Sequence, residues 1–181
     1  MTNILIVSTC TQKLSELEFV NPITEILRMN KIPFKQVHYS NLTVKELNSA
    51  TKIIICGTAL QDNQYQNEIQ LFEWIKISQT PILGICSGAQ ILAQMHSGKI
   101  IRGEECGIYE GIIEQQDTIL ENVDTSKLYC IHNFTATLPA QAKLIVRTQF
   151  PQIFKLNNHY GCFFHPEVKQ KELITNFLSH D

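Results

Sequence analysis

Short stretches rich in apolar residues recur along the chain at residues 3–8, 34–39, 52–56, 81–85 and 160–164. They have the length of strands, and most of them lack the alternation of apolar and polar residues that a half-exposed strand shows. Continuous apolar runs of this kind are typical of strands buried on both faces of a parallel sheet. The pattern therefore predicts five strands at the core of a parallel sheet.

Segments with helical spacing lie between these runs. Asn21 and Pro22 predict an N-cap and a first-turn proline, whereas the polar residues 9–18 predict a loop. Thr43 and Glu46 have the spacing of a capping box that opens a short helix. Further helices are expected at residues 68–77, 87–96 and 168–178. Strands that alternate with helices predict an α/β fold built on a doubly wound, mainly parallel sheet.

The pattern changes after the helix expected at residues 87–96. Short β-like runs then follow one another without clear helices between them, which is typical of antiparallel strands. The runs are residues 100–101, 108–113, 128–131, 134–138, 144–147 and 152–155. We expect them to form an additional antiparallel β block on the parallel core.

Length and composition predict one domain over residues 1–181, with a formal net charge of -2. The basic residues are too sparse for a surface that follows a nucleic-acid backbone, and no stretch is long and apolar enough to span a membrane. The N-terminus lacks the basic leader and cleavage site of a secretory signal. The six cysteines occur singly, without Cys-x-x-Cys spacing, so neither a metal site nor a disulfide framework is expected. These features predict a cytoplasmic protein.

One apolar run ends in Gly84-Ile-Cys86-Ser-Gly88, and helix-forming residues follow at once. A nucleophile on a sharp strand-to-helix turn needs small neighbours two positions away on each side, and both glycines satisfy this. The helix expected to begin at Ser87 directs free N–H groups and its positive dipole end toward the sulfur, which favours the thiolate. Cys86 is therefore a candidate nucleophile, although a single cysteine in an apolar run is more often a packing residue.

A second apolar run ends in His165-Pro166-Glu167. A thiolate nucleophile needs a base that can also protonate the leaving group, and imidazole does both near neutral pH. The carboxylate of Glu167 can accept the other ring N–H and fix the orientation of the ring. Open α/β sheets bind ligands at the carboxyl ends of their strands, so Cys86, His165 and Glu167 can form a Cys-His-Glu triad. Taken alone, the tripeptide fits a surface histidine before a helix equally well.

Other residues near the candidate nucleophile can serve the same chemistry. Gln90 lies one helical turn beyond Cys86, so its amide can face the same pocket. The backbone N–H of Ser87 and the loop at Gly57 and Thr58 are candidate donors for the oxyanion of an acyl-transfer intermediate. A solvent-facing glutamine at residue 90 and an ordinary turn glycine at residue 57 are the alternatives.

The two motifs together, Gly84-Ile-Cys86-Ser-Gly88-Ala-Gln90 and His165-Pro166-Glu167, resemble those of the class I glutamine amidotransferases, the triad glutaminase family. The resemblance covers essentially the whole chain and implies a flavodoxin-like glutaminase fold. It implies that Cys86 attacks the side-chain amide of L-glutamine, giving a γ-glutamyl thioester and ammonia, after which water releases glutamate.

The resemblance also implies roles for other parts of the chain. Gln90 and the segment Ile131-His132-Asn133 are expected to hold the amino and carboxylate groups of the substrate, with Gly57 in the oxyanion hole. Glu105, in Glu-x-Gly, matches a family position that is expected to be structural. Size and layout are most similar to the free-standing glutaminase subunit of GMP synthetase, so the implied partner is a synthetase subunit that accepts ammonia.

Three positions depart from the pattern of that subfamily. Residues 57–60 are Gly-Thr-Ala-Leu instead of a Gly-Gly-Pro-like loop, and His132 is followed by Asn133 instead of an acidic residue. Cys162 and Phe163 replace the usual valine and glutamine before the His-Pro-Glu motif. These departures affect the expected identity of the partner more than the expected reaction.

Two other functions remain open. The same triad can serve a self-sufficient hydrolase of γ-glutamyl or related C–N bonds, because one acyl-transfer site accepts many planar acyl groups. The departures from the subfamily are also compatible with a non-catalytic regulatory module on the same fold. No Walker-type or dinucleotide-binding glycine pattern is present, so we expect no cofactor and no activation of ATP on this chain.

Overall fold

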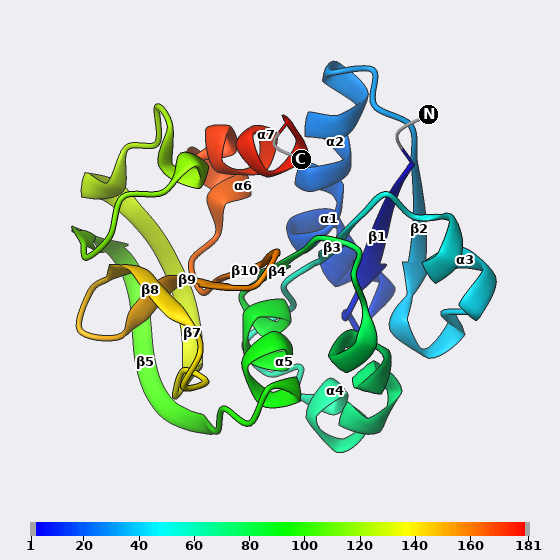
Figure 1. Ribbon diagram of the computed structural model, residues 1–181, viewed down its shortest axis with the longest axis horizontal. Helices are drawn as coiled ribbons and strands as arrows, with labels where there is room; N and C mark the ends of the chain where they lie inside the picture. Colours follow the sequence, from blue (N-terminus) through cyan, green and yellow to red (C-terminus); the bar gives the residue numbers. More distant parts are fainter. Residues whose placement is uncertain (1–2, 180–181) are drawn as a thin grey trace.

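The computed structural model describes residues 3–179 and contains an eight-stranded sheet in the order β2-β1-β3-β4-β10-β9-β8-β6 (Figure 1). The first five strands of this order run parallel to one another. They are β2 (Phe34–His38), β1 (Ile4–Ser8), β3 (Lys52–Ile55), β4 (Ile82–Ile85) and β10 (His159–Cys162). The five predicted parallel strands are confirmed, with ends that differ by up to two residues.

Helices cover both faces of the sheet, and the two-residue period of the strands divides the core between them. Ile4 and Ile6 of β1 belong to one hydrophobic cluster, and Leu5 and Val7 belong to the other. The first cluster includes residues of α1 (Glu16–Phe19), α2 (Asn21–Met29) and α7 (Lys171–Ser179). The second includes residues of α4 (Gln64–Asn67), the 3-10 helix η3 (Ile69–Ile77) and α5 (Ser87–Met95). This is the doubly wound, flavodoxin-like arrangement that the alternation predicts.

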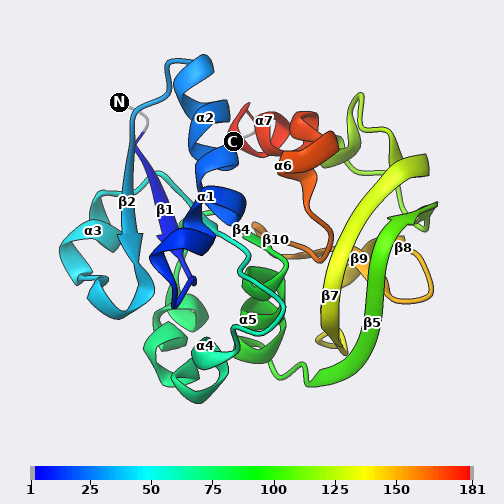
Figure 2. The same ribbon diagram turned by 180° about the vertical axis from the view of Figure 1, so that it is seen from behind.

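Three antiparallel strands extend the sheet beyond β10, and two more form a separate ribbon. The extension consists of β9 (Pro151–Leu156), β8 (Lys143–Arg147) and β6 (Ile112–Ile113). The ribbon pairs β5 (Ile100–Tyr109) with β7 (Leu128–Ala136) and lies next to α5 (Figure 2). The predicted antiparallel block is confirmed. Its runs at residues 128–131 and 134–138 are parts of one strand, however, and residues 108–113 divide between β5 and β6.

The helical predictions hold for the main helices and fail in detail elsewhere. The capping box at Thr43 and Glu46 is present and opens α3 (Val44–Ser49). Residues 9–18 are not only a loop, because the 3-10 helix η1 (Lys13–Ser15) and α1 form there. Asn21 is not an N-cap but the first residue of α2. The closing helix divides into α6 (Pro166–Lys169) and α7 at Gln170, whose buried amide donates to two backbone carbonyls of the 124–127 segment.

The carboxyl ends of three adjacent parallel strands place the motifs at one edge of the sheet. The order β3-β4-β10 brings together the segments that follow these strands, which carry Gly57, Cys86 and His165. The remaining short helices are η2 (Tyr39–Asn41), η4 (Thr118–Leu120) and η5 (Thr125–Lys127). Within residues 3–179, no helix has the length and apolar character needed to cross a lipid bilayer.

Candidate active site

Cys86 occupies a sharp turn between β4 and α5. Its backbone has φ 50° and ψ -104°, a conformation that costs a non-glycine residue conformational energy and that is held here by the surrounding structure. A Cβ added to Gly84 would lie 2.4 Å from the backbone of Gly88, and one added to Gly88 would lie 2.3 Å from the carbonyl oxygen of Ile55. The two glycines are therefore required sterically, as the sequence predicts for a strand-to-helix corner.

The thiol of Cys86 lies close beneath the molecular surface, with the residue 5% exposed. Its backbone N–H donates to the carbonyl of Cys162 at 2.7 Å, which ties the turn to the end of β10. The sulfur lies 3.9 Å from the carbonyl oxygen of Ile131, a long and weak contact. Among the residues that the structure describes, this weak contact is the hydrogen bond that the sulfur makes.

His165 and Glu167 form a buried pair at the end of β10. The Nδ1 atom of the ring lies 2.8 Å from Oε1 of Glu167, and the two residues are 1% and 2% exposed. Burial alone would lower the pKa of His165, but the adjacent carboxylate and the nearby Cys86 thiol outweigh it and hold this pKa well above its ordinary value. Such a ring carries its proton near neutral pH and has Nδ1–H directed to the carboxylate.

The other ring nitrogen of His165 is available. Nε2 is buried and makes no hydrogen bond within the described part of the chain. A Cβ built on Gly57 would lie 2.9 Å from Cε1 of His165 and 3.2 Å from Cβ of Cys86, so the ring and the cysteine meet above this glycine. The arrangement leaves one imidazole nitrogen free beside a thiol, which is what nucleophilic catalysis with proton transfer needs.

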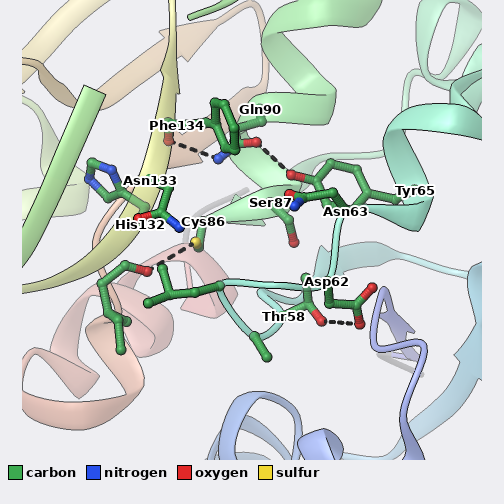
Figure 3. Close-up of a pocket in the computed structure, with 13 residues that line it drawn as sticks. Thr58, Asp62, Asn63, Tyr65, Cys86, Ser87, Gln90, His132, Asn133 and Phe134 are labelled. Atoms are coloured by element: carbon green, nitrogen blue, oxygen red, sulfur yellow. Dashed lines mark hydrogen bonds between the residues drawn. The ribbon is translucent and has the colours of Figure 1, made fainter. Parts of the chain in front are cut away.

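A narrow cleft opens next to the thiol (Figure 3). Its walls are the 58–65 segment, the first turn of α5 and the 131–134 segment of β7. Ser87, a predicted contributor to the oxyanion hole, lies in this wall, and its hydroxyl donates to the carbonyl of Cys56 at 3.1 Å. The side chain of Ser87 is thus engaged, whereas its backbone N–H belongs to the free first turn of α5.

Gln90 lines the cleft, but its amide is already bound within the protein. Nε2 donates to the carbonyl of Phe134 at 2.9 Å, and Oε1 accepts from the hydroxyl of Tyr65 at 2.6 Å (Figure 3). One N–H of the amide is left for a ligand. The predicted substrate contact therefore needs either that N–H or a rearrangement that releases Gln90 from Tyr65 or Phe134.

The predicted substrate segment of β7 turns alternate side chains in opposite directions. Ile131 and Asn133 are half-buried beside the cleft, whereas the ring of His132 is buried on the inner face of the ribbon. There Nδ1 of His132 lies 2.9 Å from the carbonyl oxygen of Gly103, and Nε2 lies 3.5 Å from Oε2 of Glu105. The structure thus directs the imidazole away from the cleft and leaves the backbone of His132 to line it.

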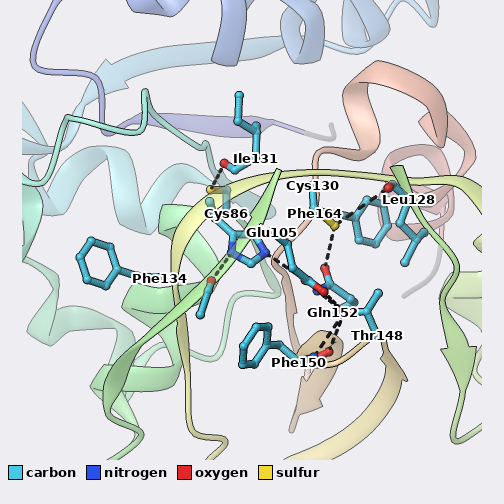
Figure 4. Close-up of polar contacts among 12 residues, drawn as sticks. Cys86, Glu105, Leu128, Cys130, Ile131, Phe134, Thr148, Phe150, Gln152 and Phe164 are labelled. Carbon is cyan, nitrogen blue, oxygen red and sulfur yellow. Dashed lines mark hydrogen bonds and ion pairs between the residues drawn. The ribbon is translucent and has the colours of Figure 1, made fainter. Parts of the chain in front are cut away.

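Glu105 is the centre of a buried polar cluster behind the cleft (Figure 4). Its two carboxylate oxygens accept from the hydroxyl of Thr148 and the amide of Gln152, each at 2.6 Å. The ligand-type atoms of Glu105, Cys130 and His132 lie within 4.8 Å of one another, which is close enough to hold a metal ion. Burial, followed by the charge of Glu105, raises the pKa of the Cys130 thiol, so without a metal this thiol stays protonated. The cluster links the ribbon to β9, in line with the structural role expected of Glu105.

Sequence reasoning did not identify Tyr65 or Asp62 as residues of this site. Both lie in the cleft wall, and Asp62 accepts a hydrogen bond from the hydroxyl of Thr58 at 2.8 Å. The sequence offers no spacing signal for either, because they occur in a polar stretch without a recognisable motif. Their places depend on contacts with Gln90 and with the segment after β1.

Comparison with known proteins identifies related sequences and folds. The family model for class-I glutamine amidotransferases matches residues 15–181. One subunit of a glutamine-hydrolyzing GMP synthase from Methanosarcina barkeri is 28% identical over 167 residues, covering 78% of this chain and 88% of the relative. A glutamine-hydrolyzing GMP synthase from Spiroplasma kunkelii is 27% identical and covers 93% of this chain but 36% of the relative, so the chain spans about a third of that protein.

The fold also matches solved structures. A putative GMP synthase subunit from Thermoplasma acidophilum superposes with a TM-score of 0.86 and covers 98% of this chain and 92% of that one. Its sequence identity is 21%, so this likeness concerns the fold alone.

Proposed function

The chain belongs to the class-I glutamine amidotransferase family, and from this we propose that it hydrolyses the side-chain amide of L-glutamine to glutamate and ammonia. The observation that carries the proposal is the convergence of three groups at one edge of the sheet. The Cys86 thiol lies on a strained corner, the free Nε2 of His165 is beside it, and Glu167 holds the far side of the ring at 2.8 Å. We assign all 181 residues to a single glutaminase domain.

The proposed first step is acyl transfer to sulfur. The thiolate of Cys86 adds to the Cδ carbonyl of glutamine, and the carbonyl electron pair moves to oxygen. Backbone N–H groups of Ser87 and of the Gly57–Thr58 loop stabilise this oxyanion. When the tetrahedral intermediate collapses, the C–N bond breaks and His165 transfers its Nε2 proton to the leaving nitrogen, which departs as ammonia.

The second step hydrolyses the γ-glutamyl thioester. His165, now neutral at Nε2, removes a proton from water while the water oxygen bonds to the thioester carbon, and the C–S bond then breaks to release glutamate. The raised pKa of His165 suits both steps, because the charge of Glu167 stabilises the imidazolium that each cycle forms and consumes. No cofactor takes part.

The ammonia has a proposed destination. The relative from Methanosarcina barkeri is named as a subunit of GMP synthase, and this chain covers 88% of it. We propose that the chain is the glutaminase component of a GMP synthase-like assembly, in which ammonia passes to a separate synthetase subunit. We also assign it to the cytoplasm and expect neither a nucleic-acid nor a membrane partner.

The test is glutamate release from L-glutamine, measured for the isolated chain and for the chain with an ATP-pyrophosphatase-type synthetase. We expect the activity to disappear in Cys86→Ala. Cys106→Ala serves as the matched control, because Cys106 is an exposed free thiol on β5, and this variant should retain wild-type activity. Equal glutamate release by wild type and Cys86→Ala would refute the proposal. Faster turnover of γ-glutamyl peptides than of glutamine would favour a self-sufficient hydrolase instead.

A further inference from the structure

A clamp of hydrogen bonds holds the loop after β3 against the segment after β1. The hydroxyl of Thr58 donates to Oδ2 of Asp62 at 2.8 Å (Figure 3). The same oxygen accepts from the backbone N–H of Thr11 at 2.6 Å, and the hydroxyl of Thr11 donates to Oδ1. Asp62 therefore joins Thr58 to Thr11, two residues that are far apart in the sequence.

Separate hydrogen bonds hold the two peptide groups that precede Thr58. The carbonyl of Cys56 accepts from the buried hydroxyls of Thr9 at 3.0 Å and Ser87 at 3.1 Å. The carbonyl of Gly57 accepts from the thiol of Cys10 at 3.6 Å. The peptide bonds of the described residues are trans, so each N–H points away from the carbonyl of its own peptide group.

Two backbone donors are left free by this arrangement. The N–H groups of Gly57 and Thr58 have no hydrogen-bond partner within residues 3–179. They belong to a segment that contacts Cys86, since a Cβ on Gly57 would lie 3.2 Å from Cβ of Cys86. The loop from residue 57 to residue 64 contains no proline, so hydrogen bonds rather than fixed backbone dihedrals must restrain it.

We propose that Asp62 is a positioning residue that holds Thr58, and with it the free N–H groups of Gly57 and Thr58, toward the oxyanion formed at Cys86. This inference rests on the proposed function. Asp62 touches neither the substrate nor the sulfur in this role but acts through the hydroxyl of Thr58. Loss of the clamp lets the two donors move away from the oxyanion, which weakens transition-state stabilisation more than substrate binding.

The test uses two reagents that alkylate the same thiol by different routes. A chloromethyl ketone analogue of glutamine reacts after the thiolate adds to its carbonyl, which forms an oxyanion. Sulfur then bonds to the methylene carbon as chloride leaves, and the first C–S bond breaks as the oxyanion re-forms the carbonyl. Iodoacetamide reacts by direct displacement of iodide, with no oxyanion at its carbonyl. The rate at Cys86 is measured for both reagents by mass spectrometry of the peptide that contains it. The ratio of the two rates reports the oxyanion donors separately from thiol access.

Asp62→Ala and Thr58→Val both break the clamp, and each should slow the chloromethyl ketone reaction by about 10- to 100-fold. The iodoacetamide rate should stay within about twofold of wild type. Asp62→Asn should recover most of the rate, because its amide oxygen can still accept from Thr58 and Thr11. Asp124→Ala is the matched control: Asp124 accepts comparable bonds from the N–H and hydroxyl of Ser126, in the segment before β7. It should leave both rates unchanged.

The possible results distinguish the proposed function from the positioning role of Asp62. If wild-type Cys86 does not react with the chloromethyl ketone faster than the other thiols, the proposed function is refuted, and this inference with it. If wild type reacts but Asp62→Ala and Thr58→Val keep its rate ratio, the positioning role alone is refuted. A fall of both reagents' rates in parallel would also refute it, because it would indicate a general distortion of the site. Thermal unfolding of each variant identifies such a distortion independently.

Discussion

Replacement of Glu167 by glutamine removes one charge and little else. Glutamine has the shape of glutamate, and its side-chain oxygen can still accept from Nδ1–H of His165, so the ring keeps its orientation. What is lost is the attraction between the carboxylate and the imidazolium. With Nδ1 and Oε1 2.8 Å apart, the centres of the two charges lie about 4 Å from each other, which corresponds to about 4 kcal/mol at an effective dielectric constant of 20.

That energy sets the expected loss of activity. Part of it offsets the cost of burying both groups, so we expect glutamate release by Glu167→Gln to fall by about 10²- to 10³-fold, mainly in kcat. The assay is steady-state glutamate release at saturating glutamine. Glu172→Gln, at an exposed position in the first turn of α7, is the control and should match wild type. Activity of Glu167→Gln within threefold of wild type would refute the role of the charge.

The same substitution should also change how the free energy of unfolding depends on pH. The folded pKa of His165 is raised, so its pair with Glu167 contributes stability that is fully present below the unfolded pKa of about 6.5 and is lost as the pH rises through the folded value. The difference in the free energy of unfolding between wild type and Glu167→Gln should therefore shrink as the pH rises above about 6.5. NMR titration of the ring should show that the pKa of His165 falls in the variant. An unchanged titration would contradict the assignment of Glu167 as the cause.

Three further predictions concern stability. Gly84→Ala places a Cβ within 2.4 Å of the backbone of Gly88 and should cost about 3 kcal/mol, lowering Tm by about 8 °C in a scanning calorimeter; a change under 1 °C would contradict the contact. Burial, followed by the charge of His96, lowers the pKa of His159 to about 4. Between pH 7 and pH 5, wild type should therefore lose about 2 kcal/mol more of its free energy of unfolding than His159→Asn, measured by chemical unfolding; equal losses would contradict this. Thr43→Ala removes the capping box and should cost about 1 kcal/mol, or about 3 °C in Tm.

The sequence predicts the parts of this fold whose signals are local. The glycines around Cys86 mark a turn because each is required by contacts a few residues away or by the adjacent strand. The contact between His165 and Glu167 can be predicted for the same reason, because a separation of two residues lets the carboxylate reach the ring. Both motifs follow apolar strands, so the parallel sheet brings them to one edge.

Other features depend on strand pairing and on side-chain contacts between segments far apart in the sequence, which no local pattern encodes. His132 turns inward with Leu128 and Cys130 because side chains alternate along β7, and which face of β7 is buried is set by its pairing with β5. The register of that pairing shifts between Arg102 and Glu105, opposite the predicted substrate segment. Tyr65 reaches Gln90 across the second hydrophobic core. The register of an antiparallel pair and a contact over 25 residues follow from tertiary packing, which a single sequence does not display.

The most direct test of the central claim is whether glutamine becomes covalently attached to Cys86. Wild-type protein and Cys86→Ala are mixed with L-glutamine, quenched in acid within the first turnover and digested for mass spectrometry. We predict a γ-glutamyl thioester on the Cys86 peptide of the wild type and on no other cysteine, and no adduct in the variant. Release of glutamate by the wild type together with an unmodified Cys86, or an adduct on a different side chain, would contradict the account.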